Sequence, residues 1–378
     1  MIPLTGRTIA SNWGGLSTDV WQVGDPGGDL TGKAAVLPTT GKAALYLSTD
    51  PDVRGPGPTL TLPAPLGHVG PGDVLVVAPD GSRVHVAWKA SATHNSLLLT
   101  ERCDHYCLMC SQPPKPGDDS YLYERAQRIV DALPPSATAL SLTGGEPTIV
   151  PTAFLGLLRH IAAVRPDLST HVLSNGRRFR EQAFTEEYVG VGIADLMVGI
   201  PLYAAEPALH DYVVQARGAF NETVKGILHL GAAGAAVEIR VVVQKATVPA
   251  LVETARFIAR NLPFVSQVAL MGLEMTGLAR PNADLVWVDP VEYRDELREA
   301  HDLLVVAGIH TRIYNHQLCV LDRALWPAAT QSISDWKNDF PPLCQPCVVK
   351  DHCAGVFTTS GARISSNLSP ILDLPDVC

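Results

Sequence analysis

The sequence predicts an α/β fold with a parallel sheet, preceded by a small β-rich region and followed by an irregular tail that carries cysteines. From about residue 95 to 310, short apolar strands alternate with helical segments, an order typical of βα units. Residues 1–93 are instead rich in Gly, Pro and Thr, and residues 311–378 show little regular periodicity. We therefore expect three domains, at 1–93, 94–310 and 311–378.

The composition narrows the class of protein. With 378 residues, of which 46% are hydrophobic and 18% charged, the chain can fold into two or three domains with a substantial core. A net charge of −9 argues against a dedicated nucleic-acid-binding protein, which would carry a basic excess. The first residues lack the apolar core of a signal peptide, and no uncharged apolar run reaches about eighteen residues. We expect a cytoplasmic protein without membrane spans.

The amino-terminal region contains one clear hairpin signal. Asp73–Ala78 and Arg83–Trp88 favour strands, and the Pro79–Ser82 segment between them has the composition of a tight turn. The function of this region is open between a cap that stabilises the rest of the chain and a docking surface for substrate or partner.

The central region carries six predicted strands with helical segments between them. Pro249 near the start of one such segment is well placed for a helix amino terminus. The strands are Ser96–Thr100, Ala139–Thr143, Thr170–Ser174, Asp195–Pro201, Val237–Val243 and Gln267–Gly272, and the helices include Tyr121–Leu133, Thr152–Val164, Ala219–Leu230, Pro249–Asn261 and Val291–Ala307.

Three cysteines with CxxxCxxC spacing follow the first of these strands. Thiolates of Cys103, Cys107 and Cys110 at this spacing can ligate three irons of a [4Fe–4S] cluster and leave the fourth iron without a protein ligand. Three alternatives remain: half of a zinc site that includes His105, a disulfide or redox pair, and buried apolar thiols.

The other five cysteines fall in the last sixty residues. This clustering, in a large chain without an export signal, indicates metal ligation more than disulfides. Five thiols suit one fully ligated [4Fe–4S] cluster with one cysteine left over, and a structural zinc site is the alternative. The final residue, Cys378, would have to order a whole tail, so we favour the other four as ligands: Cys319, Cys344, Cys347 and Cys353.

A Gly-Gly-Glu-Pro motif at Gly144–Pro147 lies downstream of the CxxxCxxC motif. The combination resembles the radical S-adenosylmethionine (SAM) enzymes. More narrowly, the chain resembles the His-Xaa-Ser system radical SAM maturases through the segments HNSLLLTERC, CLMCSQPP, HVLSNGR, HDYVVQA, VALMGLEMTG and SISDWKN. The later cysteines resemble the SPASM/twitch extensions that carry auxiliary clusters. The resemblance implies a partial (β/α)6 barrel.

The resemblance also implies the chemistry. The open iron of the cluster would be chelated by SAM, whose reductive cleavage gives a 5′-deoxyadenosyl radical that abstracts hydrogen from substrate. The implied substrate is a ribosomally made precursor peptide with His-Xaa-Ser repeats, and the implied partners are a flavodoxin or ferredoxin type electron donor and a second radical SAM maturase. The alternatives are a radical SAM enzyme acting on a small molecule, and a non-catalytic iron–sulfur or zinc scaffold for a partner maturase.

The resemblance implies that several residues of this chain contact SAM. Many relatives carry a serine where this chain has Pro201, which puts one carboxylate contact in doubt and makes Arg240 its candidate replacement, although a structural salt bridge is an alternative for that arginine. Glu274 could serve substrate or SAM, or cap a helix, and the pair His210 and Asp211 suits a surface or capping role better than acid–base chemistry. The expected SAM contacts are Met109, Gly144, Gly145, Glu146, Ser174, Asn175, Arg240 and Met271.

Overall fold

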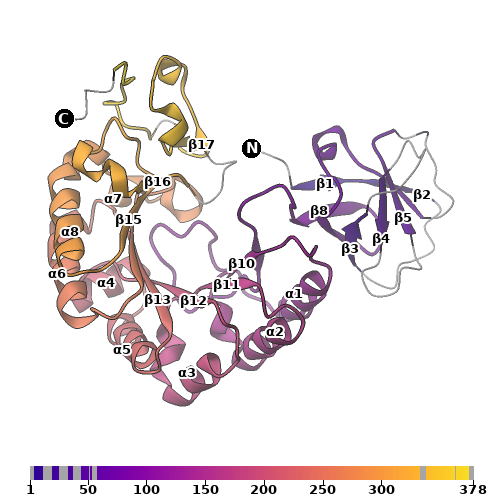
Figure 1. The fold of residues 1–378 in the computed structure, drawn as a ribbon, viewed down its shortest axis with the longest axis horizontal. Coiled ribbons are helices and arrows are strands. Elements are labelled where there is room, and N and C mark those ends of the chain that lie inside the picture. The colour runs from indigo at the N-terminus through magenta and orange to yellow at the C-terminus, as the bar shows by residue number, and fades with distance from the viewer. Residues whose placement is uncertain are drawn as a thin grey trace.

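The computed structural model describes residues 4–11, 19–24, 33–36, 44–50, 52, 58–332, 338–361 and 363–373. Figure 1 shows a curved sheet with helices on its outer side, a separate β-rich region near the amino terminus, and a short extension at the carboxyl end. No helix within the described residues is both long and apolar enough to span a membrane.

The curved sheet contains eight parallel strands in sequential order. The six predicted strands are confirmed as its first six members. The sheet then continues through two more strands, because Thr311–Tyr314 pairs with the sixth strand and buries Ile313, and Ala329–Thr330 pairs with Thr311–Tyr314. The strands are β9 (Ser96–Leu98), β10 (Ala139–Thr143), β11 (Ser169–Leu173), β12 (Leu196–Pro201), β13 (Ala236–Val242), β14 (Gln267–Met271), β15 (Thr311–Tyr314) and β16 (Ala329–Thr330).

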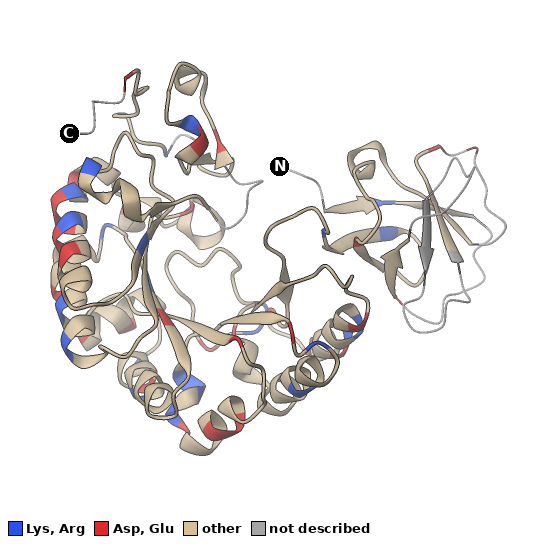
Figure 2. Cartoon of the chain, in the orientation of Figure 1, with Lys and Arg blue, Asp and Glu red and all other residues tan. Residues whose placement is uncertain are grey.

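The helices pack on the outer face of this sheet. In α1, buried side chains recur three or four positions apart, from Tyr123 through Ala126 to Ile129 and Val130, so one stripe of the helix faces the sheet. Figure 2 shows Lys and Arg interspersed with Asp and Glu on the outer helices, so neither sign dominates that layer. The helices are α1 (Tyr121–Asp131), α2 (Pro151–Val164), α3 (Gln182–Val189), α4 (Pro207–Val214), α5 (Ala219–Ala232), α6 (Leu251–Asn261), α7 (Ala283–Val286) and α8 (Arg294–Val306).

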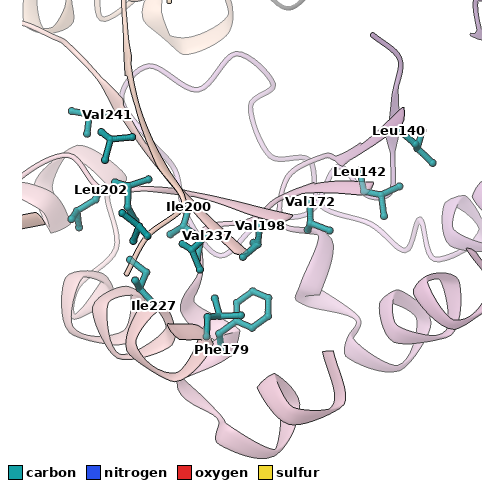
Figure 3. Packing of buried hydrophobic residues seen from close by; sticks show 14 of the residues in the cluster. Leu140, Leu142, Val172, Phe179, Val198, Ile200, Leu202, Ile227, Val237 and Val241 are labelled. Carbon is teal, nitrogen blue, oxygen red and sulfur yellow. The ribbon is translucent and has the colours of Figure 1, made fainter. Parts of the chain in front are cut away.

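The main core lies between the sheet and the helices. Alternate strand residues such as Val172, Val198 and Val237 point toward Phe179 and Ile227 on the helical layer, as Figure 3 shows. Because side chains alternate along a strand, the residues between them point to the concave face of the sheet. That face therefore holds the less apolar set, and it is where the carboxyl ends of the strands can present chemistry.

The amino-terminal region forms its own eight-stranded sheet around buried residues such as Trp21, Leu45 and Leu75. The predicted hairpin is confirmed, because β7 and β8 pair in antiparallel register. The strands, in the spatial order β1-β8-β7-β3-β4-β5-β6-β2, are β1 (Thr5–Arg7), β2 (Ile9–Ser11), β3 (Val20–Val23), β4 (Lys33–Val36), β5 (Ala44–Ser48), β6 (Thr59–Thr61), β7 (Val74–Val77) and β8 (Arg83–Trp88).

This sheet is joined to the barrel by shared packing. The Asp19 carboxylate lies 2.8 Å from Arg125 and 3.0 Å from Arg128, both on α1. Val74 and Trp88 belong to the same buried cluster as the barrel core. Removing the region would therefore expose part of that core.

The carboxy-terminal extension is short and has little regular structure. Its strands β17 (Asn338–Asp339) and β18 (Val356–Phe357) form one antiparallel pair. The buried carboxylate of Asp289 accepts a hydrogen bond from Ser365 at 2.7 Å and ties the extension to the barrel.

Candidate functional site

The loop that carries the first three cysteines, residues 101–114 (the cysteine loop), follows β9 at the carboxyl edge of the sheet. Tyr106 and Leu108 donate backbone hydrogen bonds of 3.0 and 2.9 Å to the last two residues of α4. On the other side, the Leu278 amide donates to the carbonyl of Cys110 at 2.8 Å. The loop is therefore held between two elements far apart in sequence.

Three glycines allow the backbone to approach this loop closely. Gly144 has a φ of +150°, and a Cβ there would strike the Thr100 carbonyl. A Cβ on Gly145 would strike the carbonyl of Arg102 and lie 3.1 Å from the Cβ of Cys103. Gly277, the last residue of the VALMGLEMTG segment, has a φ of +51° and packs in the same way against the carbonyl of Cys110. These contacts require glycine and fix the position of the loop.

The three thiols lie together in a desolvated setting. Burial raises the pKa of Cys103 to about 12, even though the His105 amide donates a hydrogen bond to its sulfur at 3.4 Å. Burial also raises the pKa of Cys107 and of Cys110, and the charge of each neighbouring thiolate adds to the rise at Cys107. Metal binding would have to displace protons from these thiols.

The donor set fits an iron–sulfur cluster. None of the seven described cysteines forms a disulfide, so the disulfide alternative finds no support. The buried ring of His105 has no hydrogen-bond partner at Nε2, and burial lowers its pKa to about 4. Among the described residues, no three His, Cys, Asp or Glu side chains are arranged to hold a single metal ion.

Glu146 joins the ends of two neighbouring strands. Its buried carboxylate accepts hydrogen bonds from the Thr148 amide at 2.9 Å and hydroxyl at 2.6 Å, from the Ser174 hydroxyl at 2.8 Å, and from the Asn175 amide at 2.6 Å. Burial raises its pKa, and these donors oppose the rise. Because the donors occupy the carboxylate, an ammonium group would have to displace one of them or bind the backbone of this turn. The SAM contacts of Gly144–Glu146 stay a prediction.

Cys103, Cys107, Cys110, the Gly144–Gly145 pair and this carboxylate all lie within one segment of the chain, from β9 to α6. Residues 97–258 match the family model of the radical SAM superfamily. The chain therefore carries a radical SAM domain, the domain of an enzyme class that uses a [4Fe–4S] cluster and SAM, and the expected barrel fold is confirmed. The matched segment is less than half of the chain.

Solved structures give partial matches to the fold. SuiB from Streptococcus suis, bound to S-adenosylmethionine, matches with 15% identity and a TM-score of 0.47 over 58% of this chain and 49% of its own. SuiB bound to the precursor peptide SuiA matches with 14% identity and a TM-score of 0.45, over 58% and 48%. A structure of anSMEcpe with bound AdoMet and a peptide matches with 14% identity and a TM-score of 0.41, over 58% and 62%. This chain thus spans about half the length of SuiB. No curated protein matches the sequence.

A charged network braces the cysteine loop of the radical SAM domain from outside. Arg177 donates to Asp104 at 2.8 Å and to Glu222 on α5 at 2.6 Å, and the Asn175 side chain donates to Asp104 at 2.6 Å. Asp104, Arg177 and Glu222 were not among the residues predicted from the sequence. The charge inside the cysteine motif and the basic run that follows Asn175 and Gly176 are the signals that could have indicated them.

The concave face of the sheet carries a buried ion pair. Arg240 lies 2.9 Å from the carboxylate of Glu238, which also accepts a hydrogen bond from Gln267 at 2.8 Å and lies 3.1 Å from His171. Burial raises the pKa of Glu238, but the adjacent His171 ring and the charge of Arg240 outweigh it and bring the pKa to about 2. The salt bridge expected as an alternative for Arg240 is present, and its predicted contact with the SAM carboxylate stays a prediction.

Met109, Met271 and His210 differ in how deeply they are buried and in what they contact. Met109 is buried beside Leu108 and Tyr203, whereas Met271 is half-buried at the carboxyl end of β14. His210 is buried, so the expected surface position is wrong for it, because α4 turns this ring toward Tyr203 and Phe220.

Asp211 and Glu274 have structural partners. The Asp211 carboxylate accepts from the Phe220 amide at 2.9 Å, near the start of α5, so the expected capping role is confirmed for this residue. Glu274 accepts a hydrogen bond from Thr359 of the carboxy-terminal extension at 3.3 Å.

Four of the later cysteines line one small pocket of about 20 Å³ between the barrel and the extension. Burial raises the pKa of Cys319 and of Cys344, and the charges of the neighbouring thiolates add to each rise. Backbone amides also point at two of the sulfurs, from Leu318 to Cys353 at 3.5 Å and from Ile371 to Cys347 at 3.4 Å. The expected alternative ligand Cys378, like most of the SISDWKN segment, lies outside the described residues.

Proposed function

We propose that this chain is a radical SAM peptide maturase that abstracts hydrogen from a ribosomally made peptide with His-Xaa-Ser repeats. One observation carries the proposal. The CxxxCxxC loop of the radical SAM domain is clamped against the Gly-Gly-Glu turn through contacts that only glycine allows. The segments from HNSLLLTERC to SISDWKN, which resemble His-Xaa-Ser maturases, support the substrate class.

The chain's own residues would hold and enclose the reacting groups. Cys103, Cys107 and Cys110 would ligate the cluster, and the backbone of Gly144 and Gly145 would approach SAM where a Cβ would clash. When bound, a reduced [4Fe–4S] cluster supplies the electron that cleaves SAM to methionine and a 5′-deoxyadenosyl radical. The protein positions these groups and excludes water.

The carboxy-terminal extension would carry a second cluster. The four thiols that line its pocket would supply one ligand for each iron of a cubane, and the amides directed at Cys347 and Cys353 suit anionic sulfur. A structural zinc site remains the competing assignment, and the ratio of iron to acid-labile sulfide in the purified protein separates the two.

The substrate is tested with a His-Xaa-Ser repeat peptide that carries deuterium on its side chains. Anaerobic protein, dithionite and SAM should yield 5′-deoxyadenosine that contains deuterium from the peptide. Unlabelled 5′-deoxyadenosine with an unmodified peptide would contradict the substrate and favour a small molecule. If no 5′-deoxyadenosine forms, the chain is a scaffold and the proposed activity is wrong.

A further inference from the structure

A groove separates the amino-terminal sheet from the first strand of the barrel. Its volume is about 510 Å³, and its walls come from β8, α1 and β9. Most of the lining is apolar, including Val86 and Ala87 from β8 and Ala126 from α1. The groove thus lies between the two sheets, beside the radical SAM domain.

The wall made by β9 is an exposed strand edge. In the barrel sheet β9 is the terminal strand and pairs only with β10. The carbonyl of Asn95 and the amide of Leu99 point toward β10, since they form hydrogen bonds of 3.0 and 2.8 Å with Ser141 and Thr143. Backbone groups of alternate residues point to opposite sides of a strand. The amide and carbonyl groups of Ser96 and Leu98 therefore face the groove.

No described residue forms a hydrogen bond with the backbone of Ser96 or Leu98 on that side. A row of unpaired amides and carbonyls is a template for another extended chain. A small ligand could satisfy one or two such groups, whereas an extended peptide satisfies alternate residues along its length. The edge therefore favours a peptide as the occupant.

The charged residues that line the groove indicate which kind of peptide would bind there. His85, Lys89 and Arg125 line the groove, and no Asp or Glu does. Lys89 and Arg125 each hold an aspartate of the amino-terminal region, Asp73 and Asp19, at 2.7 and 2.8 Å. A segment that alternates apolar and acidic residues fits an apolar groove with this lining better than a basic one does.

One end of the groove also lies beside the cysteine loop. Thr143, which precedes Gly144, and Gln112 both line it. The Gln112 carbonyl accepts a hydrogen bond from the thiol of Cys110 at 3.0 Å. A chain bound along β9 would thus be delivered to the cluster end of the barrel.

We propose that the groove binds an extended, apolar and acidic segment of the precursor peptide by adding it as a strand to the free edge of β9. The inference rests on the proposed function, because it takes the peptide to be the substrate. It assigns the amino-terminal region a docking role in which β8 and the first barrel helix form the walls and β9 supplies the hydrogen bonds.

The test compares Ser96→Pro with Ser96→Ala. Proline at this position removes one of the two amides that face the groove and leaves the ladder to β10 intact, as edge strands tolerate. The probe is a fluorescein-labelled peptide in which an alternating Val-Glu segment precedes His-Ala-Ser repeats, with a Val-Lys version as its partner. By fluorescence anisotropy, Ser96→Pro should bind the Val-Glu probe about tenfold more weakly than Ser96→Ala, and wild type should bind the Val-Lys version more weakly.

A second pair of variants tests the opposite wall without changing a strand backbone. Ala87→Glu places a carboxylate in the groove and should weaken binding of the Val-Glu probe, whereas Ala87→Lys should retain it. SAM cleavage without peptide is measured in every sample and should stay at the wild-type level. This readout separates failure of docking from failure of the proposed function.

Three outcomes would overturn the docking site: equal affinity of the two Ser96 variants, failure of wild type to bind the Val-Glu probe, and equal affinity of the two Ala87 variants. If size-exclusion chromatography instead shows that Ser96→Pro converts a dimer to a monomer, the occupant is a second copy of this chain. That result also contradicts the proposal.

Discussion

Substitution of Glu238 gives a quantitative test of how much the buried ion pair on the concave face of the barrel stabilises the fold. Its carboxylate is 2% exposed and contacts Arg240, Gln267 and His171. The folded-state pKa of about 2 lies below the ordinary value of 4.5. A depressed carboxyl pKa contributes stability that is present above the unfolded pKa and is lost as the pH falls through the folded one. At about 1.4 kcal/mol for each tenfold change in proton affinity, the contribution is about 3 kcal/mol.

Glu238→Gln should therefore lower the free energy of unfolding by about 3 kcal/mol near neutral pH, because Arg240 loses its charged partner. The difference between wild type and variant should shrink between about pH 5 and pH 2, as the wild-type carboxylate takes up its proton. The measurement is denaturant unfolding of both proteins, prepared with equal iron content and followed by circular dichroism across this pH range.

Glu253→Gln is the matched control for this experiment. Glu253 pairs with Arg256 at 2.8 Å on an exposed face of α6, where salt bridges contribute little. Its substitution should change the free energy of unfolding by less than about 0.5 kcal/mol at every pH. A Glu238→Gln effect below about 1 kcal/mol, or one that does not vary with pH, would refute the reasoning.

The glycine and cysteine contacts yield two further predictions. Gly145→Ala should destabilise the protein by about 1–3 kcal/mol and reduce the iron bound by the cysteine loop, because the new methyl group strikes the carbonyl of Arg102. Gly156→Ala on α2, where the space is open, is the control and should change neither stability nor iron content. A Gly145→Ala protein with wild-type stability and iron content would contradict the contact. Cys319→Ala should lose about four irons in iron and sulfide analysis whereas Cys378→Ala keeps them, and the reverse would show that Cys378 is the ligand.

Local patterns in the sequence predicted the elements whose signals are local. The β7–β8 hairpin follows from a turn between two β-favouring runs, and the six barrel strands follow from apolar runs between helical segments. The strand β16 has only two residues, and its pairing with β15 depends on a distant segment. Such a strand has no periodicity that a sequence could reveal.

The same distinction between local signals and contacts with distant segments applies to the candidate site. Cys103, Cys107 and Cys110 lie in one short loop, so their spacing alone indicated them as candidate ligands. Arg240 lies two residues from Glu238 on the same strand, whereas His171 and Gln267 come from β11 and β14, and only the register of the sheet brings those two to Glu238. For Glu146, the sequence indicated an acceptor but not that the next strand would supply two of its donors.

The central claim is that the loop of three cysteines holds the cluster that cleaves SAM. The most direct measurement is 5′-deoxyadenosine formation by dithionite-reduced protein given SAM, in wild type and in a variant with Cys103, Cys107 and Cys110 all changed to Ala. The variant should form no 5′-deoxyadenosine while it retains the metal of the carboxy-terminal extension. Continued formation of 5′-deoxyadenosine by the triple variant would contradict the account.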